Sequence, residues 1–197
     1  MPKNTDVRVG APDQKVTGAI KHAPVGTPLP DLTDITKAAV TLNEAFAGDE
    51  YVSEDGRTLS PSRSTTEIKE WSGATVRKVL ESFDGTLAWT MISTNAGALE
   101  IAFGSANVTT AAATTAHGAQ VKAALGAYLP EEQAWVFLMK DGDARIVIAV
   151  PDGQITEVGE VTFASNAAVG WNVTLSCYPD ANGNSIYIMT DDGVVTA

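Results

Sequence analysis

The side chains best suited to acid–base or metal chemistry are few and widely separated in this sequence. The only histidines are His22 and His117, and neither has a second histidine, a cysteine or a paired carboxylate at ligand spacing. A zinc or iron site needs several such ligands around one ion. The sequence also lacks a G-x-S-x-G elbow, a P-loop and a G-x-G-x-x-G fingerprint. We therefore predict no catalytic residue, no metal and no cofactor, and we expect that the protein is not an enzyme.

The remaining reactive or acidic groups have structural explanations. Cys177 is the single cysteine, so the chain cannot form an internal disulfide. It continues a period-2 apolar pattern with Val173 and Leu175, which favours a small buried side chain over a reactive thiol. The acidic pairs Glu131-Glu132 and Asp191-Asp192 flank strand-like runs, where solvated strand ends account for them.

The charge of the chain is strongly negative and uneven. The formal net charge is −11, of which residues 1–80 contribute −1 and residues 81–197 contribute −10. Such a chain lacks the basic surface that grips nucleic acid. Its acidity serves either solubility alone or a surface that repels phosphate, and composition does not choose between them. No apolar run approaches the roughly 18 residues of a membrane span, and residues 1–9 lack the apolar core of a secretory signal, so we expect no membrane insertion and folding in a cytoplasm.

Turn-forming pairs divide the chain into short segments. Asp-Gly or Asn-Gly pairs tolerate the positive φ that tight hairpins require. The runs between them are rich in β-branched and aromatic residues, which predicts a mainly β fold. These pairs begin at residues 55, 84, 141, 152, 182 and 192.

Two runs predict the centre of the fold. Residues 135–139 (WVFLM) and 144–150 (ARIVIAV) are almost continuously apolar, which is typical of strands buried on both faces. The Asp-Gly pair between them predicts a hairpin. We also expect the Asn-Gly pair at 182 to join the alternating run 169–179 to a strand at 185–190 in a second hairpin.

One helix is predicted near 95–103. Asn95 is a suitable N-cap, apolar residues follow at helical spacing, and Gly104 suits the position after the end. Weaker helical patterns cover 119–127 and 33–46.

The four tryptophans divide into two groups. Trp89, Trp135 and Trp171 fall at inward positions of strand-like runs, where core packing explains them. Trp71 instead ends the polar run STTEIKEW, and an exposed tryptophan of this kind suits a subunit interface.

An ordered series of motifs resembles the major tail protein, or tail tube protein, of long non-contractile-tailed bacteriophages, particularly siphoviruses of actinobacteria. Together the motifs extend over most of the chain, from about 15 to 190. They are YVSEDG from Tyr51, LSPSRSTTEIKEWSGATVRKV at 59–79, LAWTMISTN at 87–95, LEIAFG at 99–104, GAIKHAPVGTPLP at 18–30 and WNVTLSCYPDANGNSIYI at 171–188.

The resemblance implies a tail tube fold, in which two packed antiparallel β-sheets form a sandwich or barrel with one flanking helix. It implies a single domain over 1–197, without the C-terminal immunoglobulin-like domain that many relatives carry. Six subunits would form a ring, the rings would stack into a tube around the tape-measure protein, and the tube would conduct the genome. The implied partners are the subunit itself and the tape-measure, tail-tip and tail-terminator proteins, while double-stranded DNA passes through without specific binding. The implied location is the tail of the virion.

Assembly would use segments that are extended before it begins. We expect a flexible arm at about 1–14 and long loops at about 24–33, 53–66 and 104–118, which could become ordered on assembly. The predicted interface residues lie around the third of these segments and at the exposed tryptophan: Tyr51, Ser53, Glu54, Asp55, Arg57, Ser60, Arg63 and Trp71.

In such a tube, the acidity of the chain would have a role in the central channel through which DNA passes. A conduit lined with lysine or arginine would trap DNA, whereas an acidic lining would let it slide. Glu157 and Glu160, in a strand-like run with few apolar residues, are the acids that we expect to face the lumen.

Other functions remain open at this point. A tube protein of a contractile tail or a secretion system would share the fold. A virion decoration protein or a carbohydrate-binding β-sandwich would instead require an exposed aromatic cluster. A small hydrolase would require a catalytic signature.

Overall fold

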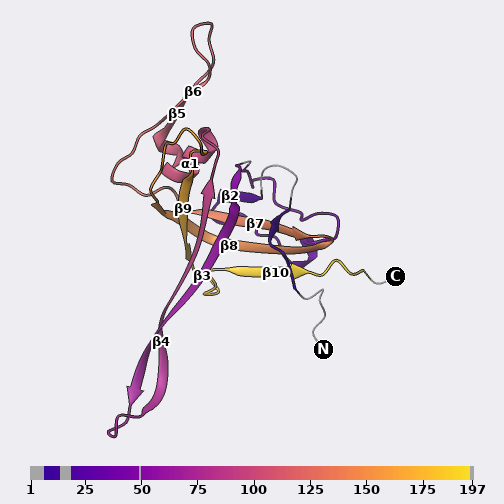
Figure 1. Cartoon of the computed structure of the whole chain (residues 1–197). Helices are drawn as coiled ribbons and strands as arrows, with labels where there is room; N and C mark the ends of the chain where they lie inside the picture. Colours follow the sequence, from indigo (N-terminus) through magenta and orange to yellow (C-terminus); the bar gives the residue numbers. More distant parts are fainter. Residues whose placement is uncertain (1–6, 14–18, 49, 196–197) are drawn as a thin grey trace.

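The computed structural model describes residues 7–13, 19–48 and 50–195. The fold is mainly β with one α-helix, as predicted (Figure 1). Its elements in chain order are β1 (Ala11–Pro12), β2 (Ile20–Pro24), the 3-10 turn η2 (Leu32–Asp34), β3 (Val52–Lys69), β4 (Thr75–Met91), α1 (Ala96–Phe103), the 3-10 turn η3 (Ser105–Asn107), β5 (Val108–Ala111), β6 (Gln120–Ala123), β7 (Gln133–Asp141), β8 (Ala144–Val158), β9 (Trp171–Tyr178) and β10 (Tyr187–Asp191).

Within the described residues, eight strands form one curled antiparallel sheet and two form a small separate sheet. The order along the large sheet is β1-β7-β8-β9-β4-β3, with β2 also paired to β7 and β10 also paired to β8. The small sheet is the hairpin β5–β6. Figure 1 shows this hairpin near α1, at the end of the molecule opposite to the far end of β3 and β4.

The hairpin β7–β8 is the centre of the fold and is buried on both faces, which confirms the prediction. Alternate residues of β7 enter two different apolar clusters: Trp135 and Phe137 pack with β4, β9 and α1, while Ala134 and Val136 pack beneath the loop that includes Phe46. The Asp-Gly turn between the strands is formed as expected, with Gly142 at φ 60°. A continuously apolar strand therefore marks a layer that is covered on both sides.

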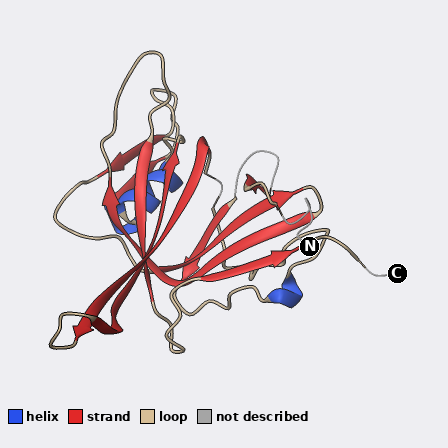
Figure 2. Cartoon of the chain, turned by 60° about the horizontal axis from the view of Figure 1, so that its bottom comes forward, coloured by secondary structure: helices blue, strands red, loops and turns tan. Residues whose placement is uncertain are grey.

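The sheet curls strongly around the first of these clusters. Trp89 on β4 and Trp135 on β7 have ring centroids 5.6 Å apart, although β8 and β9 separate the two strands in the sheet. Three strand spacings in a flat sheet would span about 14 Å. The curl thus brings the two regions of one sheet together over a shared core, with α1 at its side (Figure 2).

Strand β8 has different neighbours along its two halves, and this overturns the second predicted hairpin. β9 pairs with residues 152–158 of β8, whereas β10 pairs with residues 145–149. The Asn182-Gly183 turn therefore connects strands that lie one after the other along β8 and are not paired with each other. The cause is length: β8 has 15 residues and β9 only 8, so part of the β8 edge is free for β10.

Helix α1 confirms its prediction at both ends. The Asn95 side chain accepts a hydrogen bond from the Ala98 backbone amide at 2.9 Å, and Gly104 follows the helix at φ 82°. Gly97 in the first turn lies against the buried Glu50 carboxylate, since an added Cβ would be 2.3 Å from Glu50 Oε1. A carboxylate at this position is favoured by the helix dipole.

The two weaker helix predictions are wrong. Residues 119–127 contain strand β6, and residues 33–46 form an irregular cover over the sheet with a bridge between Ile35 and Val40. The apolar residues of this cover do pack on β7 and β8, as their pattern indicated. In place of helical hydrogen bonds, three backbone carbonyls of this cover accept hydrogen bonds from Arg145.

Arg145 fixes this cover to the sheet. Its side chain is 2% exposed and donates hydrogen bonds to the carbonyls of Thr36, Lys37 and Ala38 at 2.7, 3.0 and 2.8 Å. It also forms an ion pair with Asp13, next to β1. One buried guanidinium thus joins the N-terminal strand, the cover and β8.

The four segments predicted as arm or loops have different outcomes. Residues 53–66 are not a loop but most of strand β3, in which Asp55-Gly56 produces a bulge with Gly56 at φ 71°. The segment 104–118 contains η3 and β5 before it becomes irregular, and 24–33 is irregular except at its end. Of the predicted arm 1–14, residues 1–6 and 14 lie outside the described residues, and Ala11–Pro12 pair with β7.

Candidate assembly surface

The far part of the β3–β4 hairpin projects from the sheet as an isolated two-stranded ribbon (Figures 1 and 2). β9 pairs with β4 only along residues 85–91, so the paired residues from Ser62–Asp84 outward have no third strand among the described residues. We call residues 62–84 the ribbon. Every residue in it is exposed to solvent. At about 3.3 Å per residue, it extends about 30 Å beyond the sheet.

Both faces of the ribbon carry exposed apolar side chains. Cross-strand partners share a face, and neighbours along a strand alternate between faces. Leu80, which is 57% exposed, therefore lies on one face, and Val79 lies on the other. Ile68 is 49% exposed and shares the face of Val79. Apolar groups exposed on two solvated faces are unusual for a soluble monomer.

Polar contacts hold the ribbon together in the absence of a core. Ser64 and Thr66 donate hydrogen bonds to the Glu81 carboxylate, which lowers the pKa of Glu81. On the opposite face, Lys78 pairs with Glu67 at 3.1 Å. Exposed pairs of this kind stabilise weakly, and a two-stranded hairpin alone is marginally stable.

The tip of the ribbon presents a tryptophan to solvent. The turn is closed by hydrogen bonds between Glu70 and Ala74 and between Gly73 and Glu70, both 2.9 Å long, with Gly73 at φ 90°. Trp71 within it is 103% exposed. Full exposure of the largest apolar side chain suits an anchor that is buried by a partner.

Among the described residues, no further strand pairs with either edge of the ribbon. β3 is the last strand of the sheet, and this part of β4 lies beyond β9. Unpaired backbone groups on two edges are a template for adding strands from other chains, and soluble monomers usually avoid them.

A second surface is polar and lies on the outer face of β4, β9 and β8. Its side chains point away from the apolar core because they alternate with core residues. Thr156 and Ser176 lie on this face with their hydroxyl oxygens 2.8 Å apart. The outward residues of the paired parts of β4 and β9 are Thr86, Ala88, Thr90, Asn172, Thr174, Ser176 and Tyr178.

The family of the chain is decided by a match over nearly its whole length. The family model described as phage tail tube protein matches residues 3–197. The chain belongs to the phage tail tube protein family. It is therefore a structural component of the phage tail.

The other comparisons add little to this assignment. The tail tube chain has no significant match among curated proteins. Among solved structures it is similar to the tube-terminating cap of the anti-feeding prophage, with a TM-score of 0.46, 12% identity, and coverage of 77% of this chain and 86% of that chain. A likeness at this level does not establish a shared role.

The structure brings most of the predicted interface residues onto one element of the tail tube protein. Tyr51 lies immediately before β3, and the others lie on β3 or, for Trp71, at the turn that follows it. Arg57 differs, because its guanidinium lies 5.5 Å from the Phe137 ring and donates to the Ala19 carbonyl at 3.3 Å. Burial lowers the pKa of Arg57 to about 10. This side chain is engaged within its own chain.

The predicted interface residues did not include the exposed apolar residues of β4. Val76, Val79 and Leu80 are exposed on β4, and their run TVRKVLESF at 75–83 mixes apolar and charged residues without strict alternation. A strand with both faces solvated has no reason to alternate, so the usual signal was absent.

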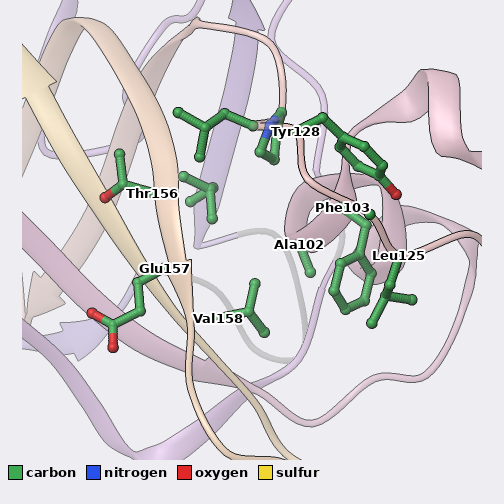
Figure 3. A pocket seen from close by; sticks show the side chains of 11 residues that line it. Ala102, Phe103, Leu125, Tyr128, Thr156, Glu157 and Val158 are labelled. Atoms are coloured by element: carbon green, nitrogen blue, oxygen red, sulfur yellow. The ribbon is translucent and has the colours of Figure 1, made fainter.

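The two acids predicted to face a lumen are both exposed. Glu157 pairs with Thr174, which places it on the polar outer face, and Glu160 lies just beyond the end of β8. Figure 3 shows the Glu157 carboxylate directed away from Ala102 and Phe103 of α1.

The histidines and the cysteine occupy separate environments. His22 on β2 lies against Trp135 with ring centroids 5.2 Å apart, and burial lowers its pKa. His117 lies in the irregular segment between β5 and β6. Cys177 is buried as predicted, and burial raises the pKa of its thiol to about 12. No cluster of three potential metal ligands occurs in the part of the chain that the structure describes.

No helix among the described residues is long and apolar enough to cross a membrane.

Proposed function

We propose that this tail tube protein assembles into hexameric rings, and that the rings stack into the tube of a long non-contractile phage tail. The observation that carries the proposal is the ribbon, which is solvated on both faces and open on both edges. Such an element is a liability for a monomer and becomes useful when neighbouring copies cover it. The protein acts by assembly and performs no catalysis.

The polar outer face of β4, β9 and β8 is our choice for the lining of the bore. Its paired strands present threonine, serine, asparagine and tyrosine side chains, with Glu157 among them. Duplex DNA carries about one negative charge per 1.7 Å of axis, so a lining without cations and with some acids holds it weakly. The genome would then move along the tube without specific binding.

Other tail components would meet the same subunit. The tape-measure protein would occupy the bore before the genome does, and the tail-tip and tail-terminator proteins would contact the first and last rings. Assembly would take place in the host cytoplasm, before the virion is released.

Two alternatives differ in what they require. A tube of a contractile tail or a secretion system would use the same surfaces and would differ in its outer partners. A decoration or carbohydrate-binding module would need a cluster of exposed aromatic rings, but Trp89 and Trp135 are 3% and 1% exposed. The buried tryptophans therefore favour assembly over sugar binding.

The proposal is tested by electron microscopy of the purified, concentrated protein. We expect rings or hollow tubes of uniform width with sixfold symmetry. A matched variant replaces residues 63–83 by a short Gly-Ser turn between the Ser62–Asp84 pair, which removes only the ribbon and leaves the apolar core and the rest of the sheet in place. This variant should remain folded by circular dichroism and should form no tubes.

The proposal fails if the wild-type protein stays monomeric up to high concentration and binds glycans. If the shortened variant forms tubes as well as the wild type does, the ribbon has no part in assembly.

A further inference from the structure

An apolar groove lies at the end of the molecule opposite to the ribbon tip. It is formed by the end of α1, the segment after β6 and the end of β8, and Figure 3 shows Phe103, Leu125 and Val158 around it. Leu125 and Leu129 in its wall are 71% and 57% exposed, and Tyr128 is 39% exposed. The groove is thus apolar and open to solvent.

The groove is preformed. The Gln154 side chain donates to the Pro130 carbonyl at 2.8 Å, which fixes the segment after β6 to strand β8. The Tyr128 amide bonds the Gly126 carbonyl at 3.0 Å, which shapes the turn between them. A partner that enters therefore does not have to order the wall first.

The size of the groove suits one aromatic ring. Its volume is about 190 Å³. An apolar cavity of roughly 150 Å³ is enough to hold a benzene molecule. A tryptophan at the end of a narrow turn can enter a groove of this size, whereas a folded domain cannot.

The charges of the groove and the tip are complementary. The segments that form the groove carry Glu100, Glu131, Glu132 and Glu157 and contain no lysine or arginine. Residues 67–78 at the tip carry three cations and two acids. The tip is therefore positive where the groove is negative, although the chain as a whole has a net charge of −11.

The two features cannot meet within one chain. Figure 1 shows the ribbon tip and α1 at opposite ends of the molecule. A projection at one end and a receptor at the other form a head-to-tail contact between copies, which closes into a ring or continues as a stack according to the rotation between them. Rings and stacks are both parts of the assembly proposed above.

We propose that Trp71 at the ribbon tip of one copy inserts into the groove between α1 and the end of β8 of a second copy. The proposal rests on the assembly proposed above and adds the receptor for the tip. Phe103, Tyr128 and Leu129 contact the indole, and the cations of the tip lie beside the glutamates of the groove.

Cross-linking between different chains tests the proposal. One chain carries Trp71→Cys and the other carries Leu129→Cys, and the two are mixed, assembled and mildly oxidised. Cys177 is buried, so it adds little background. We expect a disulfide-linked dimer of the two different chains in the assembled fraction. The matched control replaces Leu129→Cys by Ile188→Cys on β10, a site that is 58% exposed, and should give no such dimer.

A second measurement uses chains without new cysteines. Trp71→Ala and Leu129→Ala should each raise the concentration needed for tube growth at least about 10-fold, the effect of losing an interface anchor. Added salt should raise it further, because the flanking charges are screened.

The outcomes separate the two proposals. If wild-type tubes form but the Trp71–Leu129 cross-link is absent or equals the control, the tip has another receptor, and the assembly proposal stands. If wild-type protein forms neither rings nor tubes and the mixed cysteine variants give no cross-link, both proposals are overturned.

Discussion

The hairpins β7–β8 and β3–β4 use the same secondary structure for opposite purposes. In the first, both faces are covered, and Trp135 is 1% exposed. In the second, the ribbon is solvated on both faces, and Trp71 is 103% exposed. The hairpin β7–β8 is therefore core along its length, whereas β3–β4 contributes to the core only through residues such as Trp89, and its ribbon has no buried residue. Matched substitutions in the two hairpins can break or sharpen this difference.

The largest contrast is expected between two tryptophans. Trp135→Ala should lower the free energy of unfolding by about 3–5 kcal/mol, since it leaves a cavity in the core. It also removes the hydrogen bond from Trp135 Nε1 to the Gly153 carbonyl. Trp71→Ala should change the free energy of unfolding by less than about 0.5 kcal/mol, as is usual for exposed sites. Urea denaturation of the monomer measures both, and equal effects would refute the comparison.

Replacing the buried Arg145 should lower the free energy of unfolding by nearly as much. Arg145→Ala should cost about 3–5 kcal/mol, because the Asp13 carboxylate and three backbone carbonyls lose their donor. Arg63→Ala in the ribbon, whose guanidinium lies 5.4 Å from the Phe83 ring, should cost less than about 1 kcal/mol. Urea denaturation at neutral pH measures both. A stable Arg145→Ala protein would show that the cover of residues 33–46 holds to the sheet without the guanidinium.

A smaller effect is expected at the helix start. Asn95→Ala removes the acceptor for the Ala98 amide and should cost about 1 kcal/mol. Asn95→Asp keeps an acceptor and should retain the wild-type stability. Thermal unfolding followed by circular dichroism compares them, and an equal loss in both variants would mean that the cap is not what the asparagine contributes.

The smallest expected effect is a difference in reaction rate between two thiols, one buried in the core and one at the ribbon tip. Cys177 should react very slowly with a thiol reagent at pH 8, because the thiolate is the reactive form and burial raises the pKa of this thiol to about 12. A Ser72→Cys variant adds a second thiol at the tip of the ribbon, which should react rapidly in the monomer. Stopped-flow absorbance resolves the two phases. A single fast phase with two equivalents would show that Cys177 is accessible.

Helix α1 and the hairpin β7–β8 could be predicted from the sequence, whereas the ribbon could not. Helix α1 and the hairpin β7–β8 carry local signals, namely the Asn95 cap, Gly104 and two continuously apolar strands. The ribbon carries none, since its faces are both polar and apolar. The loop predicted at 53–66 overlaps the start of the ribbon and is part of β3, a strand without a period-2 apolar pattern.

Two of the Asp-Gly pairs that predict hairpin turns lie inside strands, where the glycine has another role. Gly56 lies at a bulge within β3. Gly85 lies inside β4, where an added Cβ would be 2.6 Å from Ile186 Cδ1, so its role is to make room. At Gly85 a residue distant in sequence thus explains the glycine, whereas at Gly56 the positive φ of the bulge does.

If the tube assembles as proposed, the exposed ribbon would also make a free subunit sensitive to proteases. Arg63, Lys69, Arg77 and Lys78 are cleavage sites for trypsin-like proteases, on an element that opens at little cost in free energy. A copy that has not yet been incorporated can be cut at one of these bonds, and it then loses its means of joining. A copy whose ribbon is covered keeps it. Cells in which tube growth stalls would therefore clear the surplus subunits, while finished tubes would survive the same proteases.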